Sequence, residues 1–306
     1  MPRTLIALSL SLTASLAHAD TYYLYFLGGQ SNMDGYGFVS ELPESLTGEV
    51  DGVRIFLGQI TNDLQPATGT GLWTPLTPGF GTGSRTDGKA VTQSDRFGPE
   101  LTFAMQLRGL RPGEKIAIIK YARGGSSIDD RITGSGTWDP HDTRGEGQTK
   151  GINQYDHALA TIASATHEHD IDGDGEPDTL IPAGILWMQG ETDGTNESTA
   201  NDYERNLKEL MELLRAALRM DDLPVVIGRI SDSHKGGGTD GRVWEFGDTV
   251  RAAQEKIANE DQHAALVATT DEYGYSDAAH YDTAGYIDLG KQFAEKIDEL
   301  RSQENE

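Results

Sequence analysis

A serine, an aspartate and a histidine stand near opposite ends of this chain in settings that suit nucleophilic catalysis. The apolar run Tyr22–Leu27 stops at Gly28-Gly29, and Gln30-Ser31 follows at once. Glycines let the backbone turn sharply, so a serine on this turn would be held at a strand end within reach of a substrate. Asp277-Ala278-Ala279-His280 offers a carboxylate and an imidazole on one short loop. Together these residues predict a Ser-His-Asp site for acyl transfer, which needs no cofactor.

Each member of this predicted triad has a distinct role. Ser31 is the expected nucleophile; its alternative role is the N-cap of the next helix. His280 is the expected base, because a loop before the last helix can aim its imidazole across the strand ends. Asp277 would hold the ring in the tautomer whose free nitrogen faces the serine. Asp282 is the local alternative to Asp277, and it could instead cap the final helix.

Four motifs in this chain together resemble the SGNH hydrolase superfamily. They are Gly29-Gln30-Ser31-Asn32, Ala122–Ile128, Trp187–Asp193 and Asp277-x-x-His280. Within that superfamily they are most similar to the carbohydrate acetylesterases grouped with sialate O-acetylesterases and plant-type acetylxylan esterases, a carbohydrate esterase family 6-like group. No G-x-S-x-G occurs, which argues against an α/β-hydrolase nucleophile elbow. The resemblance implies a flavodoxin-like α/β/α fold and an esterase that hydrolyses O-acetyl esters on saccharides.

Three hydrogen-bond donors are expected to stabilise the oxyanion, each worth about 3 kcal/mol of barrier. They are the backbone N–H of Ser31, the N–H of Gly125, and the side-chain amide of Gln189. Gly124 is the alternative to Gly125. An Asn in a G-x-N-D motif has the third role in the broader superfamily, and the W-x-Q-G-E pattern around Gln189 is that of the narrower esterase group. The alternative for Gln189 is a core side chain satisfied by backbone groups.

Apolar runs alternate with helical patterns along the chain, which favours a three-layer α/β/α sandwich with a mainly parallel sheet. The predicted strands are Tyr22–Leu27, Val53–Leu57, Lys115–Tyr121, Ile181–Met188, Leu223–Ile230 and Ala265–Thr270. The predicted helices are Gly98–Leu110, Asn153–His167, Asn201–Arg219, Asp248–Asn259 and Thr283–Leu300. Long glycine-rich loops, which are usually functional, connect them at Asp34–Gly52, Thr61–Phe97, Arg123–Lys150 and Ser231–Phe246.

The first 19 residues have the pattern of a signal peptide. Arg3 supplies a positive charge, Leu5–Leu16 an apolar stretch too short to span a bilayer, and Ala17-His18-Ala19 a cleavage site. We therefore expect an exported protein, periplasmic or extracellular, with residues 20–306 forming a single domain. The chain has no cysteine, which excludes disulfides, Cys nucleophiles and Cys-based zinc sites.

The charge balance limits the classes of partner. Against 25 Lys and Arg stand 49 Asp and Glu, a formal net charge of -24. Phosphate binding needs basic surface, so a nucleic acid partner is not expected. An anionic membrane would repel the chain for the same reason. An acetylated saccharide remains the expected partner.

A second constellation has the spacing of an EF-hand-type calcium loop. Carboxylates occupy positions 1, 3, 5, 7 and 9, and Gly175 stands at position 6; the carboxylates are Asp170, Asp172, Asp174, Glu176 and Asp178. Ile181 takes position 12, where the loop usually has a bidentate Glu. These residues predict a structural Ca²⁺ in a shortened loop, with an acidic turn as the alternative.

Two other functions stay open at this level. One is a lipase-like or thioesterase-like SGNH hydrolase, although few long apolar runs are present to hold an acyl chain. The other is a non-catalytic, calcium-dependent carbohydrate-binding protein, which would need none of the three triad residues. Loss of ester hydrolysis without loss of binding, on replacing Ser31, distinguishes the expected acetylesterase from the binding protein.

Overall fold

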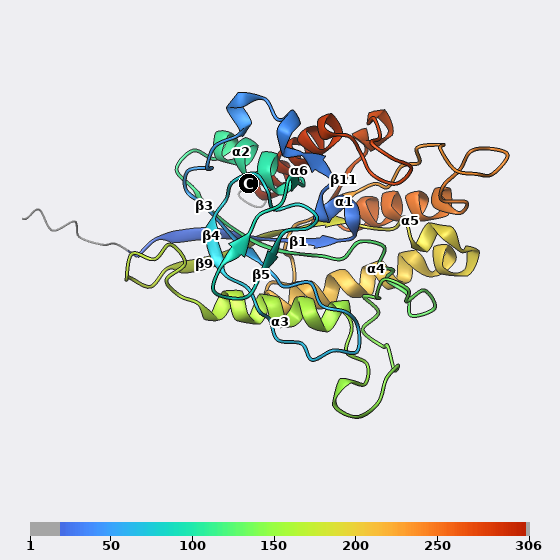
Figure 1. Cartoon of the computed structure of the whole chain (residues 1–306), viewed down its shortest axis with the longest axis horizontal. Coiled ribbons are helices and arrows are strands. Elements are labelled where there is room, and N and C mark those ends of the chain that lie inside the picture. Colours follow the sequence, from blue (N-terminus) through green and yellow to red (C-terminus); the bar gives the residue numbers. More distant parts are fainter. Residues whose placement is uncertain (1–18, 304–306) are drawn as a thin grey trace, which may run out of the picture.

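A computed structural model describes residues 19–303 of the chain. Its main sheet has seven strands in the order β11-β10-β9-β1-β8-β3-β4 (Figure 1). Six strands are parallel: β1 (Thr21–Gly29), β3 (Val53–Leu57), β8 (Lys115–Ala122), β9 (Thr179–Met188), β10 (Val225–Gly228) and β11 (Ala264–Val267). The edge strand β4 (Trp73–Pro75) runs antiparallel to β3. The predicted signal peptide lies outside the described residues, except for Ala19.

Helices cover both faces of the sheet. In Figure 1, α2 (Glu100–Leu110) and α6 (Thr283–Gln303) lie above it, and α3 (Gln154–His167) and α4 (Glu197–Ala217) lie below. The helix α5 (Gly247–Glu260) packs against α4 and β11. The three-layer α/β/α sandwich is therefore confirmed. None of the helices within residues 19–303 combines the length and hydropathy needed to cross a membrane.

Short elements decorate the loops. They are α1 (Ser31–Asp34), the pair β2 (Gly37–Phe38) with β7 (Arg96–Phe97), the pair β5 (Arg85–Thr86) with β6 (Val91–Thr92), and the 3-10 turns η1 (Val39–Glu41), η2 (Glu44–Leu46), η3 (Gly147–Thr149), η4 (Asp193–Thr195) and η5 (Thr269–Glu272). Most of these pieces are two to four residues long, so they carry no periodicity that a sequence pattern could reveal.

The predicted strands and helices of the sandwich all form, with shifts at their ends. Helix α4 begins at Glu197 and not at the predicted Asn201, because the Asn196 side chain caps it by accepting from Ser198 N at 2.9 Å. The last predicted strand ends at Val267, and the chain continues into η5. In α6 the apolar face is formed by Leu289, Phe293 and Ile297, while Ile287 is only partly buried.

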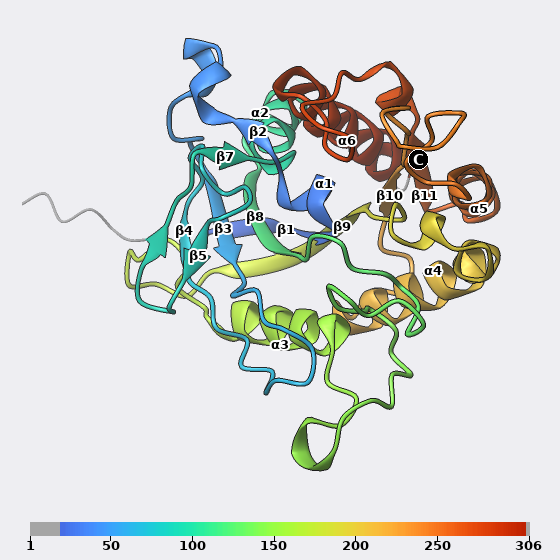
Figure 2. The same cartoon turned by 45° about the vertical axis from the view of Figure 1, so that its right-hand side comes forward.

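The strand order places a topological switch point at the carboxyl ends of β1 and β9. From β1 the chain continues toward β3 on one side, and from β9 it continues toward β10 on the other. Adjacent strands with diverging connections form the crevice where open α/β sheets bind ligands. Figure 2 shows α1 at the end of β1, near the centre of the view. This edge of the sheet is where the predicted motifs meet.

Candidate active site

Ser31 lies on a tight turn that only glycine permits. Gly29 ends β1 with φ +143°, and a Cβ on it would collide with Met188 O of β9. The Gln30 N–H donates to the same carbonyl at 2.9 Å. Ser31 then opens α1, with Gln30 rather than Ser31 at the N-cap, so the N-cap alternative is wrong. Among the described residues the Ser31 side chain has no hydrogen-bond partner, which leaves its hydroxyl for chemistry.

The imidazole of His280 is oriented by Asp277. Nδ1 of His280 lies 2.7 Å from Oδ2 of Asp277, whose Oδ1 accepts from the backbone N–H groups of Ala279 and His280. Burial raises the pKa of Asp277, but these three hydrogen bonds outweigh it and hold the pKa below the usual value. A proton on Nδ1 leaves Nε2 as the basic nitrogen. Asp282 instead caps α6, accepting from Gly285 N at 2.8 Å.

Tyr36, which the sequence analysis did not identify, packs against one face of the His280 ring. The Tyr36 and His280 rings stack with centroids 3.6 Å apart and planes 4° apart. Tyr36 follows α1 directly, so the segment that carries Ser31 also supports the imidazole. The His280 side chain retains 16% of its accessible surface.

Gly124, rather than Gly125, lies against the nucleophile. A Cβ on Gly124 would lie 3.5 Å from Ser31 Cβ. Gly125 has φ +72°, and its Cβ would approach Ser135 Oγ at 2.8 Å, so it turns the loop away. Within residues 19–303, the backbone N–H groups of Ser31, Gly124 and Gly125 donate to no other backbone group. No backbone acceptor within residues 19–303 therefore occupies any of the three N–H groups.

In the structure the Gln189 side-chain amide donates to groups other than Ser31. Nε2 of this fully buried side chain donates to Ser126 O at 3.2 Å and to the carboxylate of Asp193. Asp193 also accepts from Ser127 Oγ at 2.7 Å and thereby orders the glycine loop. Burial raises the pKa of Asp193 to about 7, although the hydrogen bonds from Ser127 and Gln189 oppose this shift. The predicted oxyanion role of Gln189 stays a prediction.

Asn32 joins four segments around the nucleophile. Its Nδ2 donates to Glu191 Oε1 at 2.7 Å and to Ala279 O at 3.1 Å, and its Oδ1 accepts from Tyr286 at 2.7 Å. Ala279 precedes His280, so the residue after the nucleophile fixes the loop of the base. Glu191 is therefore part of the loop support, and its buried Oε2 has no partner in the part of the chain that the structure describes.

The buried Glu191 carboxyl should make stability depend on pH. Burial raises the pKa of Glu191 from 4.5 to about 7, against the opposing hydrogen bond from Asn32. The folded chain thus disfavours the ionised form, so the free energy of unfolding should fall as pH rises from about 4.5 to about 7. Urea unfolding across this range should show that Glu191→Gln removes part of the decrease. Replacing the exposed Glu212 by Gln should leave the full decrease in the free energy of unfolding. An equal decrease in both variants would contradict the raised pKa assigned to Glu191.

Arg123 is the one arginine near the site without an acidic partner. Among the described arginines, Arg85, Arg123 and Arg219 have no carboxylate within 4.0 Å, and the other two are exposed. The Arg123 guanidinium donates instead to Ser135 O at 3.1 Å and Asn62 Oδ1 at 2.9 Å. These bonds join two long loops at the carboxyl edge of the sheet.

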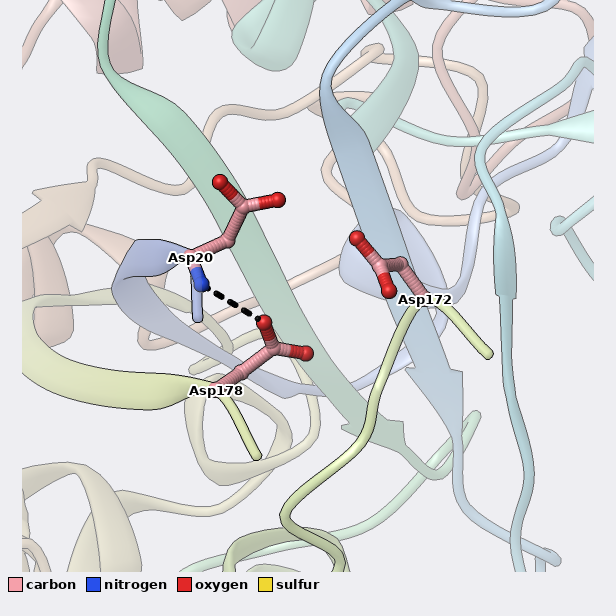
Figure 3. Close-up of side chains that lie close together, drawn as sticks. All are labelled: Asp20, Asp172 and Asp178. Carbon is pink, nitrogen blue, oxygen red and sulfur yellow. Dashed lines mark hydrogen bonds between the residues drawn. The ribbon is translucent and has the colours of Figure 1, made fainter. Parts of the chain in front are cut away.

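The five predicted calcium ligands do not form one cluster. Asp170, Asp172 and Asp174 each offer an oxygen within 4.8 Å of the others, and Asp172 also groups with Asp20 and Asp178. Figure 3 shows this second group, in which the Asp20 backbone N–H donates to Asp178 Oδ1 at 3.2 Å. Glu176 belongs to neither group, and the Lys115 ammonium pairs with Asp20 and lies 3.7 Å from Asp172.

The sequence profile of one family, described as carbohydrate esterase, sialic acid-specific acetylesterase, matches residues 21–299. The chain belongs to this family. The resemblance drawn from the four motifs is thereby confirmed, and the chain is a carboxylic ester hydrolase. No curated protein matches this esterase.

Solved structures share the fold of this family member at low sequence identity. A carbohydrate acetylesterase from Xanthomonas citri has a TM-score of 0.62 at 18% identity, over 93% of this chain and 57% of that one. NanS has a TM-score of 0.59 at 15% identity, over 94% and 100%. A protein from Arabidopsis thaliana has a TM-score of 0.57 at 21% identity, over 90% and 97%.

Proposed function

We propose that this family member is a secreted serine esterase that removes O-acetyl groups from carbohydrate through an acetyl-enzyme. The observation that carries the proposal is the oriented imidazole, bonded to Asp277 and stacked on Tyr36, on a loop that Asn32 ties to the nucleophile turn. The free Ser31 hydroxyl and the unbonded N–H groups beside it complete the set of groups that ester hydrolysis needs.

The reaction proceeds in two acyl transfers. Ser31 Oγ attacks the acetyl carbonyl carbon while Nε2 of His280 takes its proton. The N–H groups of Ser31 and of the Gly124–Gly125 loop stabilise the oxyanion, and the sugar oxygen leaves with the proton from Nε2. Water then attacks the acetyl-enzyme, gives a proton to Nε2, and releases acetate as Ser31 regains that proton. No step uses a cofactor.

A phosphonate inhibitor tests the nucleophile directly. An aryl methylphosphonofluoridate should add one phosphonyl group to the enzyme, and peptide mass mapping should place it on Ser31. His280→Ala should react far more slowly while its circular dichroism spectrum stays unchanged, because the serine then lacks its base. Labelling elsewhere, or equal labelling of both proteins, refutes the mechanism.

Export can be tested by expressing the full chain in bacteria. The protein recovered outside the cytoplasm should begin at Asp20, because the signal peptide is expected to be cleaved after Ala19.

A structural Ca²⁺ in the loop of Asp170, Asp172 and Asp174 remains part of the proposal. A site of this kind would stabilise the folded chain by RT ln(1 + [L]/Kd), or about 2.7 kcal/mol at a hundredfold excess over Kd. We expect a higher melting temperature in about 1 mM Ca²⁺ than in EGTA. This Ca²⁺ concentration is on the order of the dissociation constants of weak calcium sites. Asp174→Asn should remove the difference, and the exposed Asp222→Asn should keep it. Identical melting in both buffers would leave an acidic turn without metal.

A further inference from the structure

A cavity of about 310 Å³ lies at the same edge of the sheet as Ser31. Its walls come from the loop after β10, the start of α5 and the turn after β11, and include Ser231, Asp232, Arg242, Trp244, Arg251 and Asp271. This volume is at the lower end of the range for small-molecule sites. The Ser231–Phe246 loop is one of the long glycine-rich loops that the catalytic chemistry does not use.

The cavity adjoins the loop that carries His280. Ser233 Oγ, beside the wall residue Asp232, donates to Ala278 O at 2.8 Å, two residues before His280. Tyr275 bonds the wall residue Ser231 through its hydroxyl. Burial raises the pKa of that hydroxyl, and the charges of Glu191 in the active site and Asp232 in the cavity raise it further.

Trp244 forms the wall toward the glycine loop. A Cβ on Gly194 would lie 3.4 Å from Trp244 Cβ, and Gly194 follows Asp193, which orders that loop. Among the described residues, the indole Nε1 of Trp244 is shielded from solvent and has no hydrogen-bond partner. Since Nε1 is shielded from solvent, the part of Trp244 that borders the cavity is its ring and not its N–H.

The charged groups of the cavity already have partners: the two arginines are in ion pairs, and Asp232 accepts backbone hydrogen bonds. Arg251 forms two bonds to Asp271, at 2.6 and 2.9 Å, and Arg242 pairs with Asp248 at 2.9 Å. Asp232 accepts from the backbone N–H groups of its own loop, at Val243 and Trp244. An anionic ligand would have to displace a carboxylate from an arginine. An uncharged ligand with many hydroxyls can use these groups without breaking a pair.

We propose that this cavity is a subsite for a neutral sugar unit next to the acetylated one, with the Trp244 ring as its apolar wall. The proposal rests on the esterase function and specifies its substrate: an acetylated oligosaccharide or polysaccharide that includes uncharged sugars, rather than an isolated acetylated acid sugar.

Binding of unacetylated sugars tests the subsite separately from catalysis. Xylohexaose, cellohexaose and N-acetylchitohexaose would each be titrated calorimetrically into wild type, Trp244→Leu and Trp73→Leu. Trp73 is the matched control, because it is also partly buried but lies on the edge strand β4, with its Nε1 bonded to Ala165 O. We expect at least one hexasaccharide to bind wild type and Trp73→Leu equally, and to bind Trp244→Leu at least tenfold more weakly. Trp244→Phe, which keeps a smaller aromatic ring, should bind with an affinity between those of wild type and Trp244→Leu.

Hydrolysis of 4-nitrophenyl acetate by the same proteins distinguishes the two proposals. Trp244→Leu should keep the wild-type rate on this small ester, because the ester has no sugar to fill the cavity. Absence of hydrolysis by wild type would refute the esterase function, regardless of whether the hexasaccharides bind. The subsite is refuted if no hexasaccharide binds wild type, if Trp244→Leu binds as wild type does, or if Trp73→Leu loses binding equally.

Discussion

Replacing Ser31 by alanine should lower kcat on 4-nitrophenyl acetate by about 10⁴- to 10⁶-fold. The variant keeps the turn and the N–H groups but has no atom to form the acetyl-enzyme, so only water activated by His280 can attack. The residual rate over the uncatalysed reaction should come from the oxyanion donors and from binding. Steady-state kinetics at pH 8 with protein of verified fold measures the change.

The matched control for this experiment is Ser40→Ala. Ser40 is exposed in η1, nine residues further along the same connection, and should leave kcat within twofold of wild type. The Ser31→Ala protein should also melt like wild type, because the Ser31 side chain has no partner to lose within the described residues. A Ser31→Ala enzyme with more than a tenth of wild-type kcat would refute the serine mechanism.

Replacing Lys120 by methionine should cost about 3–5 kcal/mol of the free energy of unfolding. The Lys120 ammonium is 2% exposed in β8 and donates to Glu100 Oε2 at 2.7 Å, to Asp34 O at 2.8 Å and to Phe80 O at 2.7 Å. Without it, the Glu100 carboxylate is left buried and unpaired and two carbonyl groups lose their donor. Urea unfolding monitored by tryptophan fluorescence measures the loss.

A double replacement separates the ion pair from the packing. Lys120→Met with Glu100→Gln removes both charges and should recover part of the loss, because no unpaired charge remains buried. The exposed pair of Lys296 and Glu299 is the control, and Lys296→Met should cost less than about 1 kcal/mol. Equal losses at Lys120 and Lys296 would contradict the assigned burial. The Lys120 ammonium also bonds Asp34 O at the end of α1, the helix that begins at Ser31. We therefore expect Lys120→Met to lower kcat as well.

The parts of the site that could be predicted are those within a few residues of each other. Asp277 and His280 are three residues apart, so a single turn is enough to bring carboxylate and imidazole together. The turn at Gly29 is equally local, since a strand followed by glycine and serine needs no distant partner to be recognised. The periodicity of the long helices and buried strands likewise belongs to each segment alone.

The groups that position the site come from places far apart in the chain. Asn32 bonds Ala279 and Tyr286, which are 247 and 254 residues away, and no spacing rule links such positions. The stack of Tyr36 on His280 has the same origin. Gln189 lies in a recognisable motif, yet the carboxylate of Asp193, four residues on, engages its amide. Competition between possible partners depends on three-dimensional distance.

The sequence by itself determined the alternation of strands and helices, the family, the turn that carries Ser31 and the Asp277–His280 pair, because each depends on residues adjacent along the chain or on motifs in a recognisable order. Only the tertiary structure decided which glycine lies against Ser31, that Arg123 has no acidic partner within residues 19–303, and that four of the five predicted calcium ligands fall into two groups that share Asp172. These outcomes depend on packing between loops, because a side chain bonds the partner that the fold brings nearest. The sequence of a single segment does not specify that partner.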